Sequence, residues 1–266
     1  MGRVSVRLVW LARCVAAASR LASLAPSESL ARIGATLRGC PIVYFVHCPK
    51  TAGTAFVSLL KASPDWLQLK RAGVYVQHGR DFGDAQWRQI AEHRAARNRT
   101  IVAEEIGVGD LAARGYPYVR ETCFLATLRA PDAWLASAMR HLRVGLDAVE
   151  RRDRYFDAEN IQETMVAPAA EPYRALVLAA LERGAVGLLA GFLGLPPALP
   201  VLNRCADRRD RRPCAPVGDA ERRAIAAFVD ARYADDRRLW ARVNATARGL
   251  LLLEPRPAPA AAPGER

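Results

Sequence analysis

Lysine is scarce in this chain of 266 residues: only three of its 39 basic residues are lysines, and the other 36 are arginines. The net charge of +12 therefore owes much to a compositional bias toward arginine. A basic surface still attracts polyanions, such as a glycan or a nucleotide cofactor. Nucleic acid is also a polyanion, but the sequence has no recognisable nucleic-acid-binding motif, so we expect no nucleic-acid partner.

Long apolar runs are lacking as well. Within residues 1–40 the most apolar stretch is 6–18, and it is interrupted by Arg7 and Arg13. A helix that spans a bilayer needs about 20 predominantly apolar residues, so the pattern argues against a clean transmembrane anchor. With six arginines and one acid, the segment is typical of an organelle-targeting peptide, for a plastid or a mitochondrion, or of a poor signal anchor.

The composition predicts three regions. Residues 1–40 form the targeting or anchor segment, and residues 41–253 form a single domain long enough to bury a sizeable core. Residues 254–266 are rich in proline and alanine and are expected to be a disordered tail. The sequence does not contain a cluster of Cys and His with metal-ligand spacing, so we expect no metal.

Residues 41–60 predict a strand, a tight loop and the start of a helix. Ile42 to Val46 is a continuous apolar run of β-branched and aromatic residues, as in a strand buried on both faces of a parallel sheet. The residues of the loop that follows are mostly small or carry a hydroxyl group, and the loop includes Lys50. Free N–H groups and the dipole at the helix N-terminus favour an anion there, so the loop predicts a phosphate site. A Walker A loop places its lysine after the glycines, whereas here the lysine comes first.

The order Pro-Lys-Thr-Ala-Gly-Thr over residues 49–54 resembles the 5′-phosphosulfate loop of sulfotransferases that use 3′-phosphoadenosine 5′-phosphosulfate (PAPS). It is most similar to the Golgi carbohydrate sulfotransferases of the heparan-sulfate type. The resemblance implies that Lys50 stabilises charge on the leaving oxygen. It also implies that the 5′-phosphate is held by the loop residues Lys50, Thr51, Ala52, Gly53, Thr54 and Ala55.

A second motif follows in residues 123–145, where Phe124 to Leu128 is another short strand candidate. The resemblance implies a 3′-phosphate site made of an arginine at the strand end, a proline two residues on, and a serine eight residues after the arginine. Arg129, Pro131 and Ser137 match this pattern. An arginine can bind the phosphate with two parallel hydrogen bonds, and a serine can donate one. The family usually has Asp where this chain has Ala130, so the role of that Asp is lost or is taken by Asp132.

Sulfuryl transfer to a hydroxyl requires a base, and three candidates lie between the two motifs. Residues 100–107 predict a strand that ends in Glu104 and Glu105, and Glu105 precedes Arg129 by 24 residues, where related enzymes place a His or Glu base. His78 is the other candidate, because histidine is the commonest base near neutral pH. His47, beside the loop, is expected to shape the turn or to touch the substrate.

Cysteines and glycosylation sequons give information about the cellular compartment of the protein. The pair most expected to form a disulfide is Cys205 with Cys214, which bracket a charged loop. Cys48 is interpreted as a small buried hydrophobic residue. Sequons begin at Asn98 and Asn244, and with the resemblance they favour the Golgi or another part of the secretory pathway, with membrane association through the N-terminus.

The remaining sequence is less informative. Residues 173–195 are rich in Ala and Leu and are predicted to be helical up to residue 184. Residues 235–240 resemble the Asp-x-x-Leu-Tyr/Trp element in the last helix of many sulfotransferases.

Together the patterns predict a single α/β domain, P-loop-like, with a central parallel sheet flanked by helices and PAPS bound across the carboxyl ends of the strands. The expected activity is transfer of a sulfuryl group from PAPS to an acceptor hydroxyl, which the resemblance makes a glycan. Two alternatives remain at this level: a protein of the same fold that binds a glycan or nucleotide without catalysis, and a P-loop kinase acting on a small molecule.

Overall fold

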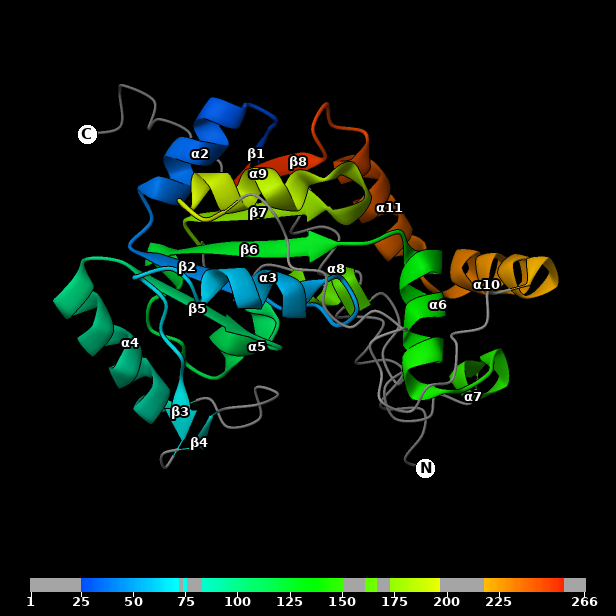
Figure 1. The fold of residues 1–266 in the computed structure, drawn as a ribbon, viewed down its shortest axis with the longest axis horizontal. Coiled ribbons are helices and arrows are strands. Elements are labelled where there is room, and N and C mark those ends of the chain that lie inside the picture. Colours follow the sequence, from blue (N-terminus) through cyan, green and yellow to red (C-terminus); the bar gives the residue numbers. More distant parts are fainter. Residues whose placement is uncertain are drawn as a thin grey trace, which may run out of the picture.

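The computed structural model describes residues 25–71, 74–75, 83–150, 161–166, 173–196 and 218–255. Its centre is a six-stranded sheet with the strand order β1-β8-β7-β6-β2-β5 (Figure 1). The strands are β1 (Ala25–Ser27), β2 (Ile42–Val46), β5 (Thr100–Glu104), β6 (Thr122–Leu128), β7 (Ala175–Ala180) and β8 (Leu250–Glu254). A separate two-stranded ribbon consists of β3 (Lys70–Arg71) and β4 (Val74–Tyr75).

Four neighbouring strands, β5, β2, β6 and β7, run parallel. Ile42 of β2 lies level with Thr100 of β5 and with Thr122 of β6, so the carboxyl ends of these three strands meet at one edge. At the other side β8 pairs antiparallel with β7, and β1 pairs antiparallel with β8. The predicted α/β class with a central, mainly parallel sheet is confirmed.

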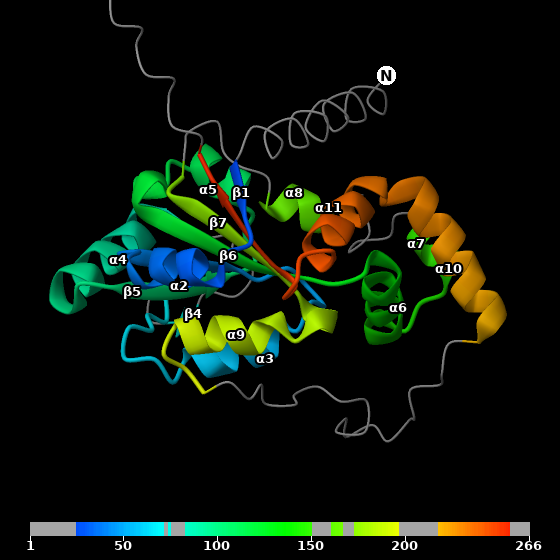
Figure 2. The same ribbon diagram turned by 90° about the horizontal axis from the view of Figure 1, so that it is seen from above.

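Helices cover both faces of the sheet (Figure 2). Strand β2 is buried along its whole length, and its side chains alternate between two cores: Tyr44 faces one and Phe45 the other. The Phe45 core is closed by α2 (Leu30–Arg38), α3 (Gly53–Leu60) and α9 (Ala185–Phe192). The Tyr44 core is closed by α4 (Asp84–Arg97), α5 (Val108–Ala113), α8 (Ile161–Val166) and α11 (Ala234–Asn244).

A third cluster lies beyond the carboxyl ends of the parallel strands, where α6 (Pro131–Leu142), α7 (Leu146–Glu150) and α10 (Asp219–Arg232) pack together (Figure 1). Trp134 of α6 and Tyr233 are its largest buried side chains, with ring centroids 5.7 Å apart. Two short 3₁₀ helices, η1 (Val119–Glu121) and η3 (Leu181–Arg183), precede β6 and follow β7. The chain leaves β2 toward β5 and then crosses to β6, so the loop after β2 lies at a topological switch point, where α/β sheets bind ligands.

The structure revises two predictions about the chain. Residues 25–40 belong to the folded domain, because β1 pairs with β8 and Ile33 and Leu37 of α2 are fully buried, so the domain begins well before residue 41. The helical prediction for residues 173–184 was wrong, because Ala175 to Ala180 forms strand β7 with all six residues buried. A strand buried on both faces has no alternation of polar and apolar residues, so its periodicity is the same as that of a buried helix.

Cysteine pairing also differs from the expectation. Cys40, which precedes β2, forms a disulfide with Cys123 of β6, a pair that the sequence did not suggest. The predicted pair, Cys205 and Cys214, lies outside the described residues. Cys48 is a free thiol, fully buried, and its burial raises its pKa, in agreement with a role in packing. Among the described helices, none combines the length and the apolar character needed to cross a membrane.

Candidate functional site

The loop between β2 and α3 has the backbone geometry of an anion site. Lys50 and Ala52 both have left-handed φ angles, 64° and 62°, with Thr51 between them. Alternation of this kind turns successive N–H groups toward one concave side, and each such residue costs about 1–3 kcal/mol of strain. Ala52 is the N-cap of α3 and offers no capping side chain, so the first N–H groups of the helix have no acceptor from it. The loop thus presents several N–H donors beside a lysine.

Thr51 anchors this loop to the sheet. It is fully buried, and its hydroxyl donates to the carbonyl of Cys48 at 2.8 Å. The hydroxyl of Thr127, in β6, donates to the carbonyl of Thr51 at 2.8 Å. The predicted phosphate contact of Thr51 is therefore limited to its backbone N–H, because its hydroxyl proton is used inside the protein. Thr54, the second residue of α3, is exposed and keeps a hydroxyl at the surface.

Gly53 is required by its neighbour His47. A Cβ atom at position 53 would lie 1.8 Å from Cδ2 of the His47 ring. The ring also stacks on Phe45, with centroids 6.0 Å apart. The His47 ring therefore packs directly against Gly53, at the start of α3. Any side chain at position 53 would push the imidazole out of this place.

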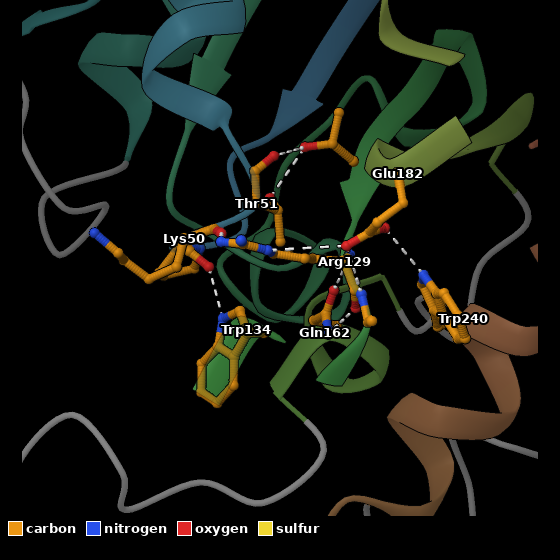
Figure 3. A network of polar contacts seen from close by, with 10 residues as sticks. Lys50, Thr51, Arg129, Trp134, Gln162, Glu182 and Trp240 are labelled. Atoms are coloured by element: carbon orange, nitrogen blue, oxygen red, sulfur yellow. Dashed lines mark hydrogen bonds and ion pairs between the residues drawn. The ribbon is translucent and has the colours of Figure 1, made fainter. Parts of the chain in front are cut away.

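The second motif lies directly against the first (Figure 3). Nη1 of Arg129 donates to the carbonyl of Lys50 at 3.4 Å, across 79 positions of sequence. The indole N–H of Trp134, in α6, donates to the carbonyl of Pro49 at 2.7 Å. Ser137 lies one turn beyond Trp134 on the same helix. The structure thus brings together the two predicted phosphate sites.

Arg129 is held tightly at its backbone and remains a cation. Its N–H donates to Gln162 at 2.8 Å, and the amide of Gln162 donates back to the carbonyl of Arg129 at 3.0 Å. Burial lowers the pKa of the guanidinium, and the nearby carboxylate of Glu182 raises it. A guanidinium stays protonated in proteins, so a partly buried positive charge stands beside the loop. In Figure 3 the side chain of Lys50 extends away from Arg129, on the other side of the loop.

Two of the three candidate bases lie within the described residues, and they differ in burial. Glu104 is 7% exposed, and its burial, with the charge of Glu105, raises its pKa to about 8, so at neutral pH it is mostly protonated. Glu105 is 27% exposed, and its Oε1 lies 3.6 Å from Nδ1 of His47, beside the phosphate loop. Of the two glutamates, Glu105 is therefore the more exposed. His78 lies outside the described residues.

Several residues around Arg129 were missed by the sequence reasoning. Gln162 comes from α8, Glu182 from η3, which follows β7, and Trp240 from α11 (Figure 3). Asp236, also in α11, accepts hydrogen bonds from the N–H groups of Gln162 and Glu163, and so fixes α8. The one sequence signal was the Asp-x-x-Leu-Trp pattern of residues 236–240, which predicted the last helix without assigning a role to its side chains.

Three buried acids in this region predict that stability falls as pH rises. Burial raises the pKa of Glu104 and of Glu163 to about 8 and that of Asp236 to about 7. The folded state therefore binds these protons more tightly than the unfolded state, and this stabilisation is lost as pH rises toward 8. We expect the free energy of unfolding to fall between pH 5 and pH 8, by up to about 1.4 kcal/mol per pH unit for each group.

Urea unfolding followed by tryptophan fluorescence at pH 5, 6, 7 and 8 measures this dependence. Glu104→Gln should flatten the curve, whereas Glu92→Gln, at an exposed position of α4, should not. A free energy of unfolding that rises over this range would contradict the expectation.

Comparison with known proteins adds a likeness of fold. No protein-family model matches the chain, and no curated protein matches it by sequence. Among solved structures, it is similar to a crystal structure of a sulfotransferase from Alicyclobacillus acidocaldarius, with 18% identity and a TM-score of 0.47. The likeness covers 77% of this chain and 96% of that one. At this identity and TM-score the likeness does not assign an activity, which has to come from the residues of the site.

Proposed function

We propose that this protein is a sulfotransferase that transfers a sulfuryl group from PAPS to an acceptor hydroxyl. The observation that carries the proposal is the hydrogen bond from Arg129 to the carbonyl of Lys50, which joins the two predicted phosphate motifs at one edge of the sheet. PAPS has a phosphosulfate at its 5′ position and a phosphate at its 3′ position. The loop of residues 50–55 suits the first group, and Arg129 with Ser137 suits the second.

Each residue of the site would have a separate role in the reaction. PAPS would supply an activated sulfuryl group whose leaving group is a phosphate. The loop N–H groups and the Lys50 ammonium would stabilise the negative charge that develops on that phosphate. Glu105, at the carboxyl end of β5, would accept the proton of the attacking hydroxyl, and His47 would hold its carboxylate. No step requires a metal.

The acceptor proposed is a sugar hydroxyl. Its support is the resemblance of the loop over residues 49–54 to that of carbohydrate sulfotransferases, together with a basic composition that favours polyanionic partners. The kinase alternative has less support, because the loop places Lys50 ahead of its glycine and the Walker A order is absent from the sequence.

Calorimetric titration with three nucleotides tests the proposal. We expect 3′-phosphoadenosine 5′-phosphate, the product form of the donor, to bind at least about tenfold more tightly than adenosine 5′-phosphate, since a charge-assisted contact to a phosphate contributes about 1.5–3 kcal/mol. ATP, with or without magnesium, should bind weakly. Arg129→Ala should remove the preference for the 3′-phosphate, because the cation beside the loop is lost.

Arg88→Ala is the matched control, since Arg88 is exposed on α4 and its loss removes the same charge from another surface. It should bind all three nucleotides as the wild-type protein does. A wild-type protein that binds ATP with magnesium more tightly than the bisphosphate would overturn the proposal, and so would a protein that binds neither.

A further inference from the structure

The carboxylate of Glu182 lies at the centre of the contacts around Arg129 (Figure 3). Its Oε1 accepts the N–H of Ala130 at 3.1 Å and lies 3.8 Å from Nε of Arg129. Its Oε2 accepts the indole N–H of Trp240 at 3.2 Å. Each oxygen therefore has its own donor, and the two donors come from different elements, the N-cap of α6 and helix α11.

Glu182 places a carboxylate beside Ala130, where the resemblance leads us to expect an Asp side chain. An alanine side chain cannot accept a hydrogen bond, so the carboxylate expected next to Arg129 is missing from this segment. Strands β6 and β7 are paired in parallel, with Leu128 level with Ala180, so Glu182 follows β7 at the same height as Ala130. A carboxylate thus reaches the Arg129–Ala130 segment from the neighbouring strand. Asp132, the predicted substitute, lies exposed in the first turn of α6.

The contacts of the guanidinium leave one of its edges for a ligand. A guanidinium has five N–H groups. In Arg129 the Nε side faces Glu182, and one N–H of Nη1 is directed at the carbonyl of Lys50. Within the described part of the chain, the contacts seen leave three N–H groups of Nη1 and Nη2 for other acceptors. Two parallel N–H groups on this edge are what a phosphate binds in the bidentate mode.

We propose that Glu182 is the positioning residue of the 3′-phosphate site, and that Trp240 fixes Glu182. The inference rests on the proposed function. Glu182 holds the Nε side of Arg129, so that the Nη1 and Nη2 edge is directed toward the phosphate loop before the nucleotide binds. Its own negative charge is offset by the N–H groups of Ala130 and Trp240, and it stands behind the guanidinium rather than beside the ligand. Affinity for the 3′-phosphate is thereby tied to helix α11.

Calorimetric titration of Glu182→Ala, Glu182→Gln and Trp240→Phe with the bisphosphate and with adenosine 5′-phosphate tests this role. We expect Glu182→Ala to bind the bisphosphate about tenfold more weakly and adenosine 5′-phosphate as the wild-type protein does. Glu182→Gln keeps the shape and one acceptor oxygen, so its loss should be about threefold, and Trp240→Phe should be similar. Glu221→Ala, at an exposed position of α10, is the control and should change neither affinity.

The ratio of the two affinities separates positioning from folding. A variant that is merely less stable loses affinity for both nucleotides and unfolds at a lower temperature. If Glu182→Ala binds the bisphosphate as well as the wild-type protein, or better, Glu182 does not position Arg129 and the inference fails while the proposed function stands. If the wild-type protein shows no preference for the 3′-phosphate, both fail.

Discussion

Replacing Lys50 with alanine is expected to lower kcat about 10²- to 10³-fold, because removing one preorganised donor from a developing negative charge has effects of this size. The affinity for 3′-phosphoadenosine 5′-phosphate should fall much less, since the loop N–H groups remain and Arg129 is untouched. Alanine keeps a Cβ atom at a residue whose φ is 64°, so the backbone strain of the loop is unchanged. The variant therefore removes the ammonium group and little else.

Transfer of radioactive sulfate from PAPS to a mixture of glycan acceptors, with calorimetry of the bisphosphate in parallel, measures both quantities. Lys61→Ala is the matched control, because Lys61 is the C-cap of the same helix and is exposed. It should retain wild-type turnover and affinity. Wild-type turnover in Lys50→Ala would show that Lys50 does not stabilise the leaving group.

Replacing Glu105 with glutamine is expected to lower kcat about 10²- to 10⁴-fold, which is the usual contribution of a general base. Glutamine keeps the shape and the contact distance to His47 but cannot accept the proton of an acceptor hydroxyl. Binding of the bisphosphate should be unchanged, because Glu105 lies on the side of His47 and not beside Arg129. The same radioactive assay and the same calorimetry apply.

Further variants distinguish Glu105 from the other residues that could act as the base. Glu104→Gln should keep most of its activity, since Glu104 is buried and already protonated near neutral pH. His47→Gln should reduce turnover less than Glu105→Gln, because His47 supports the carboxylate without taking the proton. If Glu105→Gln has wild-type turnover and His78→Ala has greatly reduced turnover, the base is His78 rather than Glu105. Glu92→Gln, on the exposed side of α4, serves as the control.

The two predicted phosphate motifs could be recognised in the sequence because each consists of contiguous residues. A buried apolar strand, a small loop and a helix start follow one another in residues 42–60, and strand β2 has the bounds that the apolar run predicts. The strand predicted for Phe124 to Leu128 was found as β6, which begins two residues earlier, at Thr122, and Pro131 is the first residue of α6. That these motifs meet was an expectation from resemblance until Arg129 was seen to contact the carbonyl of Lys50.

What failed in the sequence reasoning depended on which segments become neighbours. The Ala- and Leu-rich run of β7 has the same pattern whether it is a buried helix or a strand, and only its place between β6 and β8 decides the matter. Thr51 was predicted to help hold the 5′-phosphate, but its hydroxyl is buried against Thr127 of β6. The disulfide between Cys40 and Cys123 likewise joins residues 83 positions apart.

By itself, the sequence predicted the α/β class, strand β2 and the loop after it, because apolar periodicity and helix N-terminal chemistry act over a few consecutive residues, whereas Arg129 was predicted from the resemblance alone. Only the tertiary structure decided which of two adjacent glutamates is accessible, and which residues hold Arg129. Glu104 is the last residue of β5 and is 7% exposed, whereas Glu105 lies just beyond the strand and is 27% exposed. Gln162 of α8 and Glu182 of η3 contact Arg129, and Trp240 of α11 contacts Glu182. No local rule links such distant segments.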